Sequence, residues 1–339
     1  MRPGVCKFGC EARDDVVTSG DRMFDSAYIR ASSVNRALDV IGDRWLIMIL
    51  QQAWFGVRRF DDFQARLELA RSTLTNRLKH LLDHEVLVRE AYSDRPRRYE
   101  YRLSVKGRDL YPAAMMSLAW QQRWAPPTGQ ALVQLRHLDC GKLTTPRMSC
   151  AHCAGEVDPR EVDYALGPGA REIASRAPRR RRSTVEGQPA TRTLVSHELL
   201  EMLGDRWTPQ VAATAFFGLR RFEDMREALE LAPNILADRL RRLVELGIFR
   251  TEVYQARPQR LHYRLTDKGR AFYPILLALM QWGDRWYAPA AGVPVILSHR
   301  SCGAVLRPQV VCSACGGLLD SHNIAPVAAA PSVARSQQR

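Results

Sequence analysis

The chain has 339 residues, a formal net charge of +14 and an apolar share of 46%, which is enough for about two domains with packed cores. No stretch approaches the roughly eighteen consecutive apolar residues of a membrane helix, and the first residues lack the apolar segment of a secretion signal. We therefore expect a cytoplasmic protein that does not enter a membrane. Its basic excess would attract polyanions, nucleic acid first.

The basic residues are mostly arginine, since only five of the 50 are lysine. Arginine suits bidentate contacts with phosphate and guanine, although a GC-rich genome would produce the same bias. The chain also has eight cysteines. Because disulfides are rare in the cytoplasm, these cysteines favour metal or redox chemistry. Two of them, Cys6 and Cys10, lack a partner pair and are expected to be free thiols.

The sequence repeats itself once at a constant shift. The tetrapeptide GDRW at 42–45 recurs at 204–207, and the same register holds without a gap as far as Asp158 and Asp320. The period is far longer than that of a solenoid repeat, so we predict a duplicated domain. The two repeats are called copy 1 and copy 2, and residues related by this shift are called equivalent.

In copy 1, apolar residues recur at helical spacing over 34–53. A short helix is expected over 60–67, with acidic residues in its first turn. A second apolar stripe over 74–82 predicts another helix, and two short helices joined by a tight turn make a helix-turn-helix. Residues 87–103 predict two strands around a turn, which form a wing. Ser104 is placed to cap a final helix.

Four segments of copy 1 carry a family resemblance: RALDVIGDRW, GVRRFDDF, LTNRLKHLLDHEVLVREAY and YRLSVKGRDLYP. Copy 2 has ELLEMLGDRW, GLRRFEDM, LADRLRRLVELGIFRTEVY and YRLTDKGRAFYP in the same order. Both copies resemble the HxlR-type winged-helix transcription regulators, over roughly 32–124 and 194–286. The resemblance implies binding to operator DNA, normally as a homodimer, with the second helix of the turn in the major groove.

The resemblance places Thr73, Thr75 and Asn76 at base-reading positions, where Asn pairs with adenine and a Thr methyl contacts thymine. The alternative for the two threonines is a plain solvated helix face. Arginines before the first turn helix and on the wing would contact phosphates. The complete set of expected DNA-binding residues is Arg59, Thr73, Thr75, Asn76, Lys79, Arg95, Arg97, Arg98, Arg221, Asn234, Arg257 and Arg260.

The sequence departs from the family pattern in two places. Many members have a redox-active cysteine shortly before the first helix, but Ser32 and Leu194 stand there, so that thiol switch is not expected. The reading helix of copy 2 has Ile235, Ala237 and Asp238 at the positions of the base readers in copy 1. Either the copies read unequal half-sites, which we favour, or copy 2 reads little and mainly packs.

Each copy ends in the pattern H-x2-C-x9-C-x2-C. Zn2+ prefers four tetrahedral nitrogen and sulfur ligands, and a C-x2-C turn presents two sulfurs to one ion. We therefore predict one zinc ribbon per copy, with two structural ions per chain; the alternative is two sets of buried free cysteines. The expected ligands are His137, Cys140, Cys150 and Cys153 in copy 1, and His299, Cys302, Cys312 and Cys315 in copy 2.

The predicted fold class is α+β, mainly helical, with two winged helix-turn-helix domains in tandem. The expected segments are a disordered tail at 1–28, winged-helix domain 1 at 29–125, zinc ribbon 1 at 132–158, a basic linker at 159–192, winged-helix domain 2 at 193–287, zinc ribbon 2 at 294–320 and a disordered tail at 322–339.

The predicted function is sequence-specific regulation of transcription, with repression as the expected output. The two fused copies would act as a pseudo-dimer on double-stranded DNA, or the whole chain would form a homodimer; the sequence names no small-molecule effector. The alternatives are a protein-interaction scaffold with degenerate winged helices and a zinc- or thiol-based redox or metal sensor. We expect no enzyme, because the sequence shows neither a nucleophile paired with a base nor an open metal position.

Overall fold

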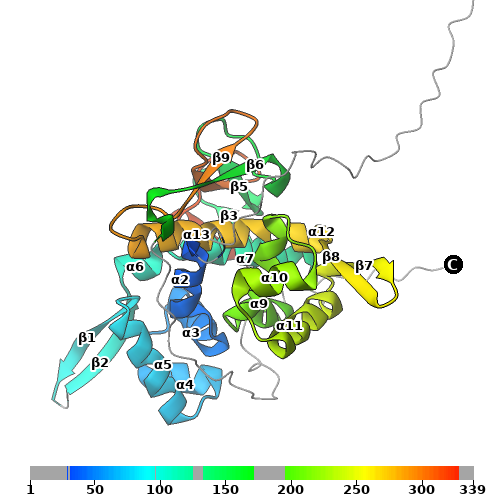
Figure 1. Ribbon diagram of the computed structural model, residues 1–339. Helices are drawn as coiled ribbons and strands as arrows, with labels where there is room; N and C mark the ends of the chain where they lie inside the picture. Colours follow the sequence, from blue (N-terminus) through cyan, green and yellow to red (C-terminus); the bar gives the residue numbers. More distant parts are fainter. Residues whose placement is uncertain (1–28, 30, 96, 125–132, 172–194, 328–339) are drawn as a thin grey trace, which may run out of the picture.

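The computed structural model describes residues 29–327 apart from 30, 96, 125–132 and 172–194 (Figure 1). The expectations for the N-terminal tail, for Cys6 and Cys10, and for most of the linker lie outside the described residues. Within the described part, none of the helices has the length and apolar character needed to span a bilayer. The two copies lie side by side, and the short strands that follow them lie together above the long helices in Figure 1.

Each copy forms a winged helix-turn-helix with the same order of elements. Copy 1 contains α2 (Ser33–Ile41), α3 (Arg44–Trp54), α4 (Phe60–Leu67), α5 (Arg71–Asp83), β1 (Leu87–Asp94), β2 (Arg97–Leu103), α6 (Val105–Arg108) and α7 (Tyr111–Trp124). Copy 2 contains α8 (His197–Leu203), α9 (Trp207–Phe216), α10 (Phe222–Leu229), α11 (Pro233–Glu245), β7 (Phe249–Ala256), β8 (Gln259–Leu265), α12 (Asp267–Arg270) and α13 (Tyr273–Tyr287).

The repeated GDRW motif explains how the turn helices are fixed. Asp43 caps α3 by accepting a hydrogen bond from the Trp45 backbone N–H at 2.9 Å, which satisfies a donor that the helix leaves free. The same carboxylate pairs with Arg77 of α5 at 2.8 Å. In copy 2, Asp205 pairs with Arg239 of α11 at 3.2 Å. One acidic residue therefore both starts a helix and ties it to the reading helix.

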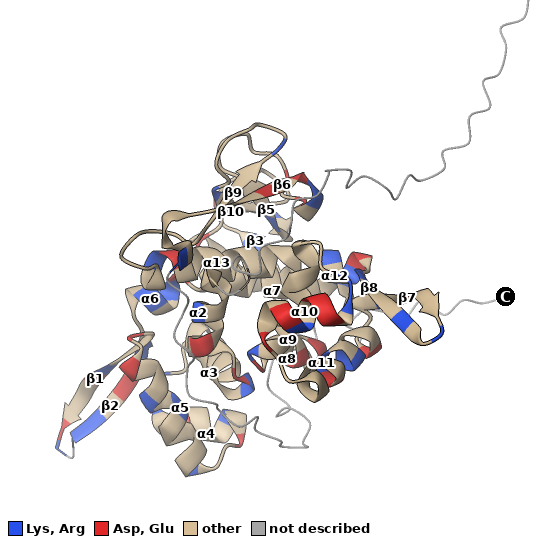
Figure 2. Cartoon of the chain, viewed as in Figure 1, with Lys and Arg blue, Asp and Glu red and all other residues tan. Residues whose placement is uncertain are grey.

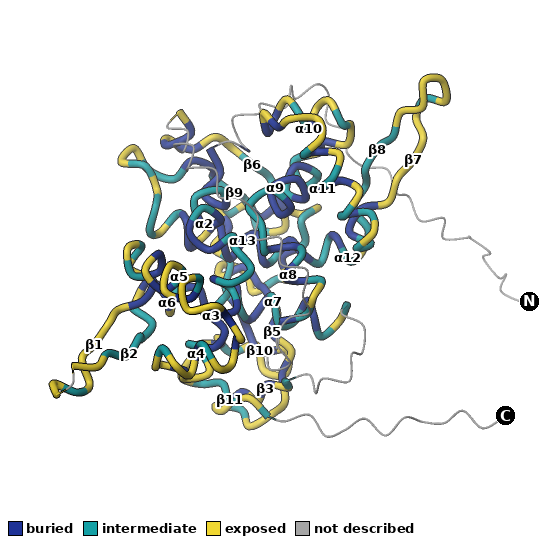
Figure 3. The backbone as a smooth tube through the Cα atoms, turned by 90° about the horizontal axis from the view of Figure 1, so that it is seen from below, coloured by how far each residue is buried: buried dark blue, intermediate teal, exposed yellow. Residues whose placement is uncertain are grey.

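The two copies share one hydrophobic core. Helix α13 of copy 2 packs against both α2 and α7 of copy 1, and α3 packs against α8. At Gly283 in α13, an added Cβ would lie 2.2 Å from the Ser33 carbonyl oxygen of α2, so only glycine permits this close approach. Figure 3 shows the buried helices in the middle and the two exposed wings, β1–β2 and β7–β8, projecting at opposite ends.

The contact between copies is reciprocal. The Trp282 indole donates a hydrogen bond to the Lys106 carbonyl oxygen at 2.9 Å. The Trp120 indole donates to the Lys268 carbonyl oxygen at 3.1 Å. Trp120 is equivalent to Trp282, and Lys106 is equivalent to Lys268, so the repeat relates one bond to the other. The copies are therefore related by an approximate two-fold axis within one chain.

The segments after the long helices form a small module of strands. Its elements are β3 (Gln134–His137), β4 (Leu143–Thr144), β5 (Pro146–Cys150), a 3-10 turn at Pro159–Glu161, β6 (Val162–Leu166), a 3-10 turn at Pro168–Arg171, β9 (Val295–His299), β10 (Pro308–Cys312) and β11 (Ile324–Val327).

Three of the four strand pairs described in this module join one copy to the other, and β3–β4 lies within copy 1. Strands β5 and β10 are antiparallel, with Met148 opposite Val310 at their centre. These two residues are equivalent in the repeat, so the approximate two-fold axis passes between them. Strand β6 pairs with β9, and β11 pairs with β3. The structure thus differs from two self-contained ribbons, because each copy supplies strands to the other.

The ordered module also extends into regions that the sequence assigns to a linker and a tail. Strand β6 lies at the start of the predicted linker, and β11 lies in the predicted C-terminal tail. Neither segment has a strong strand pattern in its own sequence. Each becomes a strand by pairing with a strand of the other copy. A partner strand that is distant in sequence accounts for this difference.

Candidate nucleic-acid interface and metal centres

Helix α5 presents the predicted base readers of copy 1. The side chains of Thr75, Asn76 and Lys79 are exposed, whereas Thr73 is half-buried. The Thr75 hydroxyl donates to the Arg71 carbonyl oxygen at 2.8 Å, which leaves its methyl group and an oxygen lone pair for other contacts. The apolar residues of α5 face the core, so one exposed face of the helix carries an amide, a hydroxyl and a cation.

The first wing carries the predicted phosphate contacts of copy 1 (Figure 2). The side chains of Arg95, Arg97 and Arg98 are exposed around the turn between β1 and β2. The Arg59 guanidinium at the start of α4 lies 4.8 Å from the centre of the Tyr92 ring on β1. This cation–π contact links the base of the wing to the start of the helix-turn-helix.

Copy 2 repeats this arrangement at its wing. The Arg221 guanidinium lies 5.1 Å from the centre of the Tyr254 ring. The side chains of Arg257 and Arg260 are exposed on either side of the second wing's turn, and Asn234 is exposed in the first turn of α11. The predicted DNA-facing residues of the two copies therefore occupy equivalent places in the two winged helices.

The reading helices themselves differ. Asp238 of α11 accepts hydrogen bonds from Arg241 at 2.8 Å and from Arg242 at 3.2 Å, and it also pairs with Arg239. Burial raises the pKa of Asp238, but the hydrogen bond and charge of the neighbouring arginines outweigh burial and lower it. The carboxylate is therefore charged and surrounded by cations of its own helix. Its equivalent in copy 1 is Asn76, whose neighbours include no such group of arginines.

The histidine and cysteine side chains form two clusters, and the cluster membership corrects the predicted pairing. Site A consists of His137, Cys140, Cys312 and Cys315. Site B consists of Cys150, Cys153, His299 and Cys302. The ligand atoms of each cluster all lie within 4.8 Å of one another.

Each site takes the H-x2-C segment of one copy and the C-x2-C segment of the other. The Nδ1 atom of His137 lies 3.3 Å from the sulfur of Cys140 in its own copy and 3.3 Å from that of Cys315 in copy 2. The physical reason is the β5–β10 pair. Each C-x2-C segment begins at the end of one of these antiparallel strands, which places it beside the H-x2-C segment of the opposite copy.

Two of the sulfur atoms, those of Cys312 and Cys150, have lowered pKa values that favour the thiolate, the form that binds metal. The pKa values of Cys302 and Cys315 are raised instead, because the lowering effect of a backbone hydrogen bond is outweighed by desolvation and the neighbouring cysteines. Burial raises the pKa of Cys312, but hydrogen bonds from the Thr144 hydroxyl and from the backbone N–H groups of Ala314 and Cys315 bring it down to about 6. The equivalent Cys150 also has a lowered pKa, because backbone hydrogen bonds outweigh its burial. Three sulfurs and one imidazole nitrogen at these separations could hold one metal ion in each site.

A residue that the sequence analysis did not identify supports site A. The Nε2 atom of His137 lies 3.1 Å from a carboxylate oxygen of Asp139. Asp139 in turn accepts a hydrogen bond from the Asn323 side chain at 3.0 Å. The spacing H-x-D-C contains the signal for this contact, since a carboxylate beside a ligand histidine orients the ring. The equivalent segment of copy 2 reads H-x-S-C.

Comparisons with known proteins agree with the two winged helices. The family model described as HxlR-like helix-turn-helix matches residues 40–129 and 202–291, which together make up more than half of the chain. The chain is 41% identical over 137 residues to the uncharacterized HTH-type transcriptional regulator Rv3095 of Mycobacterium tuberculosis (strain ATCC 25618 / H37Rv), which covers 40% of this chain and 87% of that protein.

Two further similarities were found. YvaP of Bacillus subtilis (strain 168), another uncharacterized HTH-type transcriptional regulator, is 33% identical over 92 residues, covering 27% of this chain and 85% of YvaP. The solved structure of PA1374 from Pseudomonas aeruginosa is 38% identical with a TM-score of 0.27, covering 32% of this chain and 73% of that one. From the family match and its relatives, the chain belongs to the HxlR-like helix-turn-helix family and is a DNA-binding transcription regulator.

Proposed function

We propose that the two copies of one chain act as a pseudo-dimer on operator DNA, in place of two identical subunits. The observation that carries this proposal is the reciprocal contact between copies: the Trp282–Lys106 and Trp120–Lys268 hydrogen bonds, together with the centred β5–β10 pair. These contacts bury a shared core. The assembly that presents two reading helices would therefore be built into a single chain, and light scattering should give a monomer near 38.5 kDa.

The two reading helices are proposed to contribute unequally. In copy 1, Thr73, Thr75 and Asn76 would read base edges, with Lys79 beside them. In copy 2, Asp238 is occupied by three arginines of its own helix, so its carboxylate is not free to accept from a cytosine amino group. The operator would consist of one strictly read half-site and one half-site that copy 2 holds mainly through the phosphate backbone.

The proposed phosphate contacts come from the start of each helix-turn-helix and from the wings. Phosphate contacts set position and affinity, while base contacts set sequence preference. The exposed guanidinium groups of Arg59 and Arg221 are held against Tyr92 and Tyr254, so they are positioned before DNA arrives. The remaining proposed phosphate contacts are Arg95, Arg97, Arg98, Arg257 and Arg260, with Asn234 at the first turn of α11.

We propose that each of the two clusters holds Zn2+. A tetrahedral zinc site with metal–sulfur bonds of about 2.3 Å has sulfur–sulfur separations of about 3.8 Å. Cys140 and Cys312 are 3.9 Å apart at their sulfur atoms, which fits this geometry. Four protein ligands leave no open position, so the bound ion would be structural. It would join the H-x2-C segment of one copy to the C-x2-C segment of the other.

We propose that the regulatory output is repression. A repressor acts by occupying its operator, and the DNA-bound state of the winged helices is enough for that. The test is selection from fragmented genomic DNA by the zinc-loaded full chain, near physiological salt and with excess competitor DNA. One strongly enriched half-site beside a half-site with little sequence preference is expected, followed by higher reporter expression in a strain lacking the protein. No enriched sequence, with a folded chain that contains its metal, would contradict the proposal and favour a protein-interaction scaffold.

A further inference from the structure

The two candidate metal sites have the same ligand types, three cysteines and one histidine, but different surroundings. We infer that site A holds its ion firmly, whereas site B is an exchange site for thiophilic divalent metals such as zinc and cadmium. This inference rests on the proposed metal binding and adds a division of labour between the two sites. Two independent differences around the ligands support it.

The first difference concerns the histidine ligands. In site A, His137 donates through Nε2 to Asp139, at 3.1 Å, and Asn323 holds that carboxylate in place. Such a carboxylate fixes the tautomer that presents Nδ1 to the metal, orients the ring and increases its basicity. This support crosses the copies, because Asp139 belongs to copy 1 and Asn323 to the end of copy 2.

The histidine of site B lacks this support. Its Nδ1 atom faces the sulfur of Cys153 at 3.4 Å and that of Cys302 at 3.6 Å. Its Nε2 atom is buried without a hydrogen-bond partner among the described residues. The residue equivalent to Asp139 is Ser301. The His299 ring is therefore a less basic and less firmly oriented ligand, and its buried nitrogen is destabilising because it is left unsatisfied.

The second difference concerns the C-x2-C loops. In site A, the Ser313 hydroxyl lies 3.3 Å from that of Thr144 and accepts from the Thr145 backbone N–H at 3.1 Å. The Ser313 backbone N–H also donates to the Thr144 hydroxyl at 3.0 Å. These side-chain bonds fasten the loop between Cys312 and Cys315 to the neighbouring segment of copy 1.

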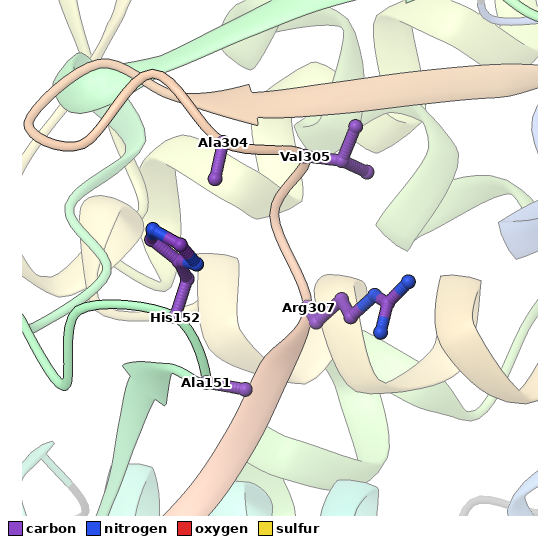
Figure 4. Close-up of a pocket in the computed structure, with 5 residues that line it drawn as sticks. All are labelled: Ala151, His152, Ala304, Val305 and Arg307. Carbon is purple, nitrogen blue, oxygen red and sulfur yellow. The ribbon is translucent and has the colours of Figure 1, made fainter.

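In site B, Ala151 stands where site A has Ser313, so the hydroxyl is absent. The loop keeps a backbone hydrogen bond from Ala151 to the Arg307 carbonyl oxygen at 2.9 Å. Beside it lies an open hollow of about 370 Å³ (Figure 4), where the His152 ring stands across from the segment that leads into β10. The lining residues are Ala151, His152, Ala304, Val305 and Arg307.

The residues that line the hollow are sequence neighbours of site B ligands. His152 lies between Cys150 and Cys153, and Ala304 follows shortly after Cys302. A small chelator or thiol that enters the hollow would lie beside the C-x2-C loop of site B, which has fewer restraints. The exposure of Cys153 adds no difference, because the equivalent Cys315 of site A is exposed as well. Both differences therefore act in the same direction, toward faster loss and uptake of metal at site B.

The test uses the zinc-loaded full chain and an excess of 4-(2-pyridylazo)resorcinol, whose absorbance reports released zinc. The expected result is two ions per chain, released in two phases of equal amplitude. Two exchanges of equivalent residues then assign the phases. Asp139→Ser gives site A the residue of site B and should accelerate the slow phase by about 10- to 100-fold. Ser301→Asp gives site B the missing carboxylate and should slow the fast phase.

A matched control is Asp158→Ser, which removes a half-buried carboxylate whose ion-pair partner is Arg160. Serine can keep the cap of the following 3-10 turn, so both phases should be unchanged. Release of two ions with one common rate would overturn the inference and leave the metal binding intact. So would a Ser301→Asp chain, folded by circular dichroism, with an unchanged fast phase. Fewer than two zinc ions per chain before any chelator is added would instead contradict the proposed metal binding itself.

Discussion

The Trp282 indole of copy 2 donates its hydrogen bond to the Lys106 carbonyl oxygen of copy 1, and both residues are buried. If a buried carbonyl loses its hydrogen-bond donor, its desolvation penalty is no longer offset by a hydrogen bond. The bond therefore couples the folding of the two copies, beyond the apolar area that the indole buries. Its counterpart, Trp120 to Lys268, joins the copies on the other side of the approximate two-fold axis, where Lys268 is only half-buried.

Trp282→Phe should lower the free energy of unfolding by about 1–3 kcal/mol, because the Lys106 carbonyl becomes a buried group without a partner. Urea unfolding followed by circular dichroism measures this change. The matched control is Trp124→Phe, since the Trp124 indole nitrogen has no hydrogen-bond partner among the described residues and the substitution removes only ring area. Equal losses for the two variants would show that the bond contributes nothing.

Base reading by α5 predicts unequal effects of equivalent substitutions in the two copies. Asn76→Ala should weaken binding to the selected operator by about 1–3 kcal/mol, the usual value of a bidentate base contact. Asp238→Ala should not weaken it, because that carboxylate is held by its own arginines. Fluorescence anisotropy with labelled operator at fixed salt measures both affinities. A similar loss for Asp238→Ala would mean that copy 2 reads bases as well.

The helices and wings could be predicted from the sequence because their signals are local. Apolar spacing and the capping residue Ser104 act within a few residues, and the structure has helices and a wing where these signals place them. The repeat makes each signal appear twice, which increases its weight. The base-reading and phosphate-contacting roles of individual residues remain predictions, because they depend on DNA.

The pairing of the metal ligands could not be predicted in the same way. The spacing H-x2-C-x9-C-x2-C is satisfied equally well by ligands from one copy or from two, so it does not distinguish between them. The choice is made by the pairing of β5 with β10, which places Met148 of copy 1 opposite Val310 of copy 2. Strand partners so far apart in the sequence have no local signal. The same holds for β6 and β11, which the sequence places in a linker and a tail.

The wing arginines should determine how binding depends on salt. If about six to eight phosphates are neutralised, log K should fall against log salt with a slope of about −5 to −7. Removing Arg97 and Arg98 together by substitution with alanine should make the slope shallower by about 2, since each phosphate contact contributes about 0.9. Anisotropy titrations over a range of potassium chloride concentrations give both slopes.

The matched control for the wing is Arg226→Ala. Arg226 lies in the last turn of α10, where it pairs with Glu223 at 2.7 Å. It is not one of the proposed phosphate contacts, so its removal should leave the slope unchanged. The base reader Asn76 provides a second comparison, because Asn76→Ala should reduce affinity without changing the slope. A wing variant with the slope of the unmodified chain would remove Arg97 and Arg98 from the phosphate contacts.

The interface between α13 and α2 predicts a pH dependence of stability. Burial raises the pKa of Asp284 to about 6, although the neighbouring Ser33 side chain and the charge of Arg36 act to lower it. The folded pKa therefore exceeds the usual value of 3.8. The stability that this carboxyl contributes is fully present below about pH 4 and is lost as the pH rises through 6, because the folded state binds the proton more tightly.

Asp284→Asn removes this titration and should stabilise the chain at pH 7.5 by up to about 3 kcal/mol, with about half of that gain remaining at pH 5. Variant and unmodified chain are compared by urea unfolding at each pH, so that any loss of metal at low pH affects both alike. Asp267→Asn is the control, because Asp267 is exposed and pairs with Arg270. A gain for Asp284→Asn that is the same at both pH values would show that the carboxyl is not buried in its charged form at the interface between the copies.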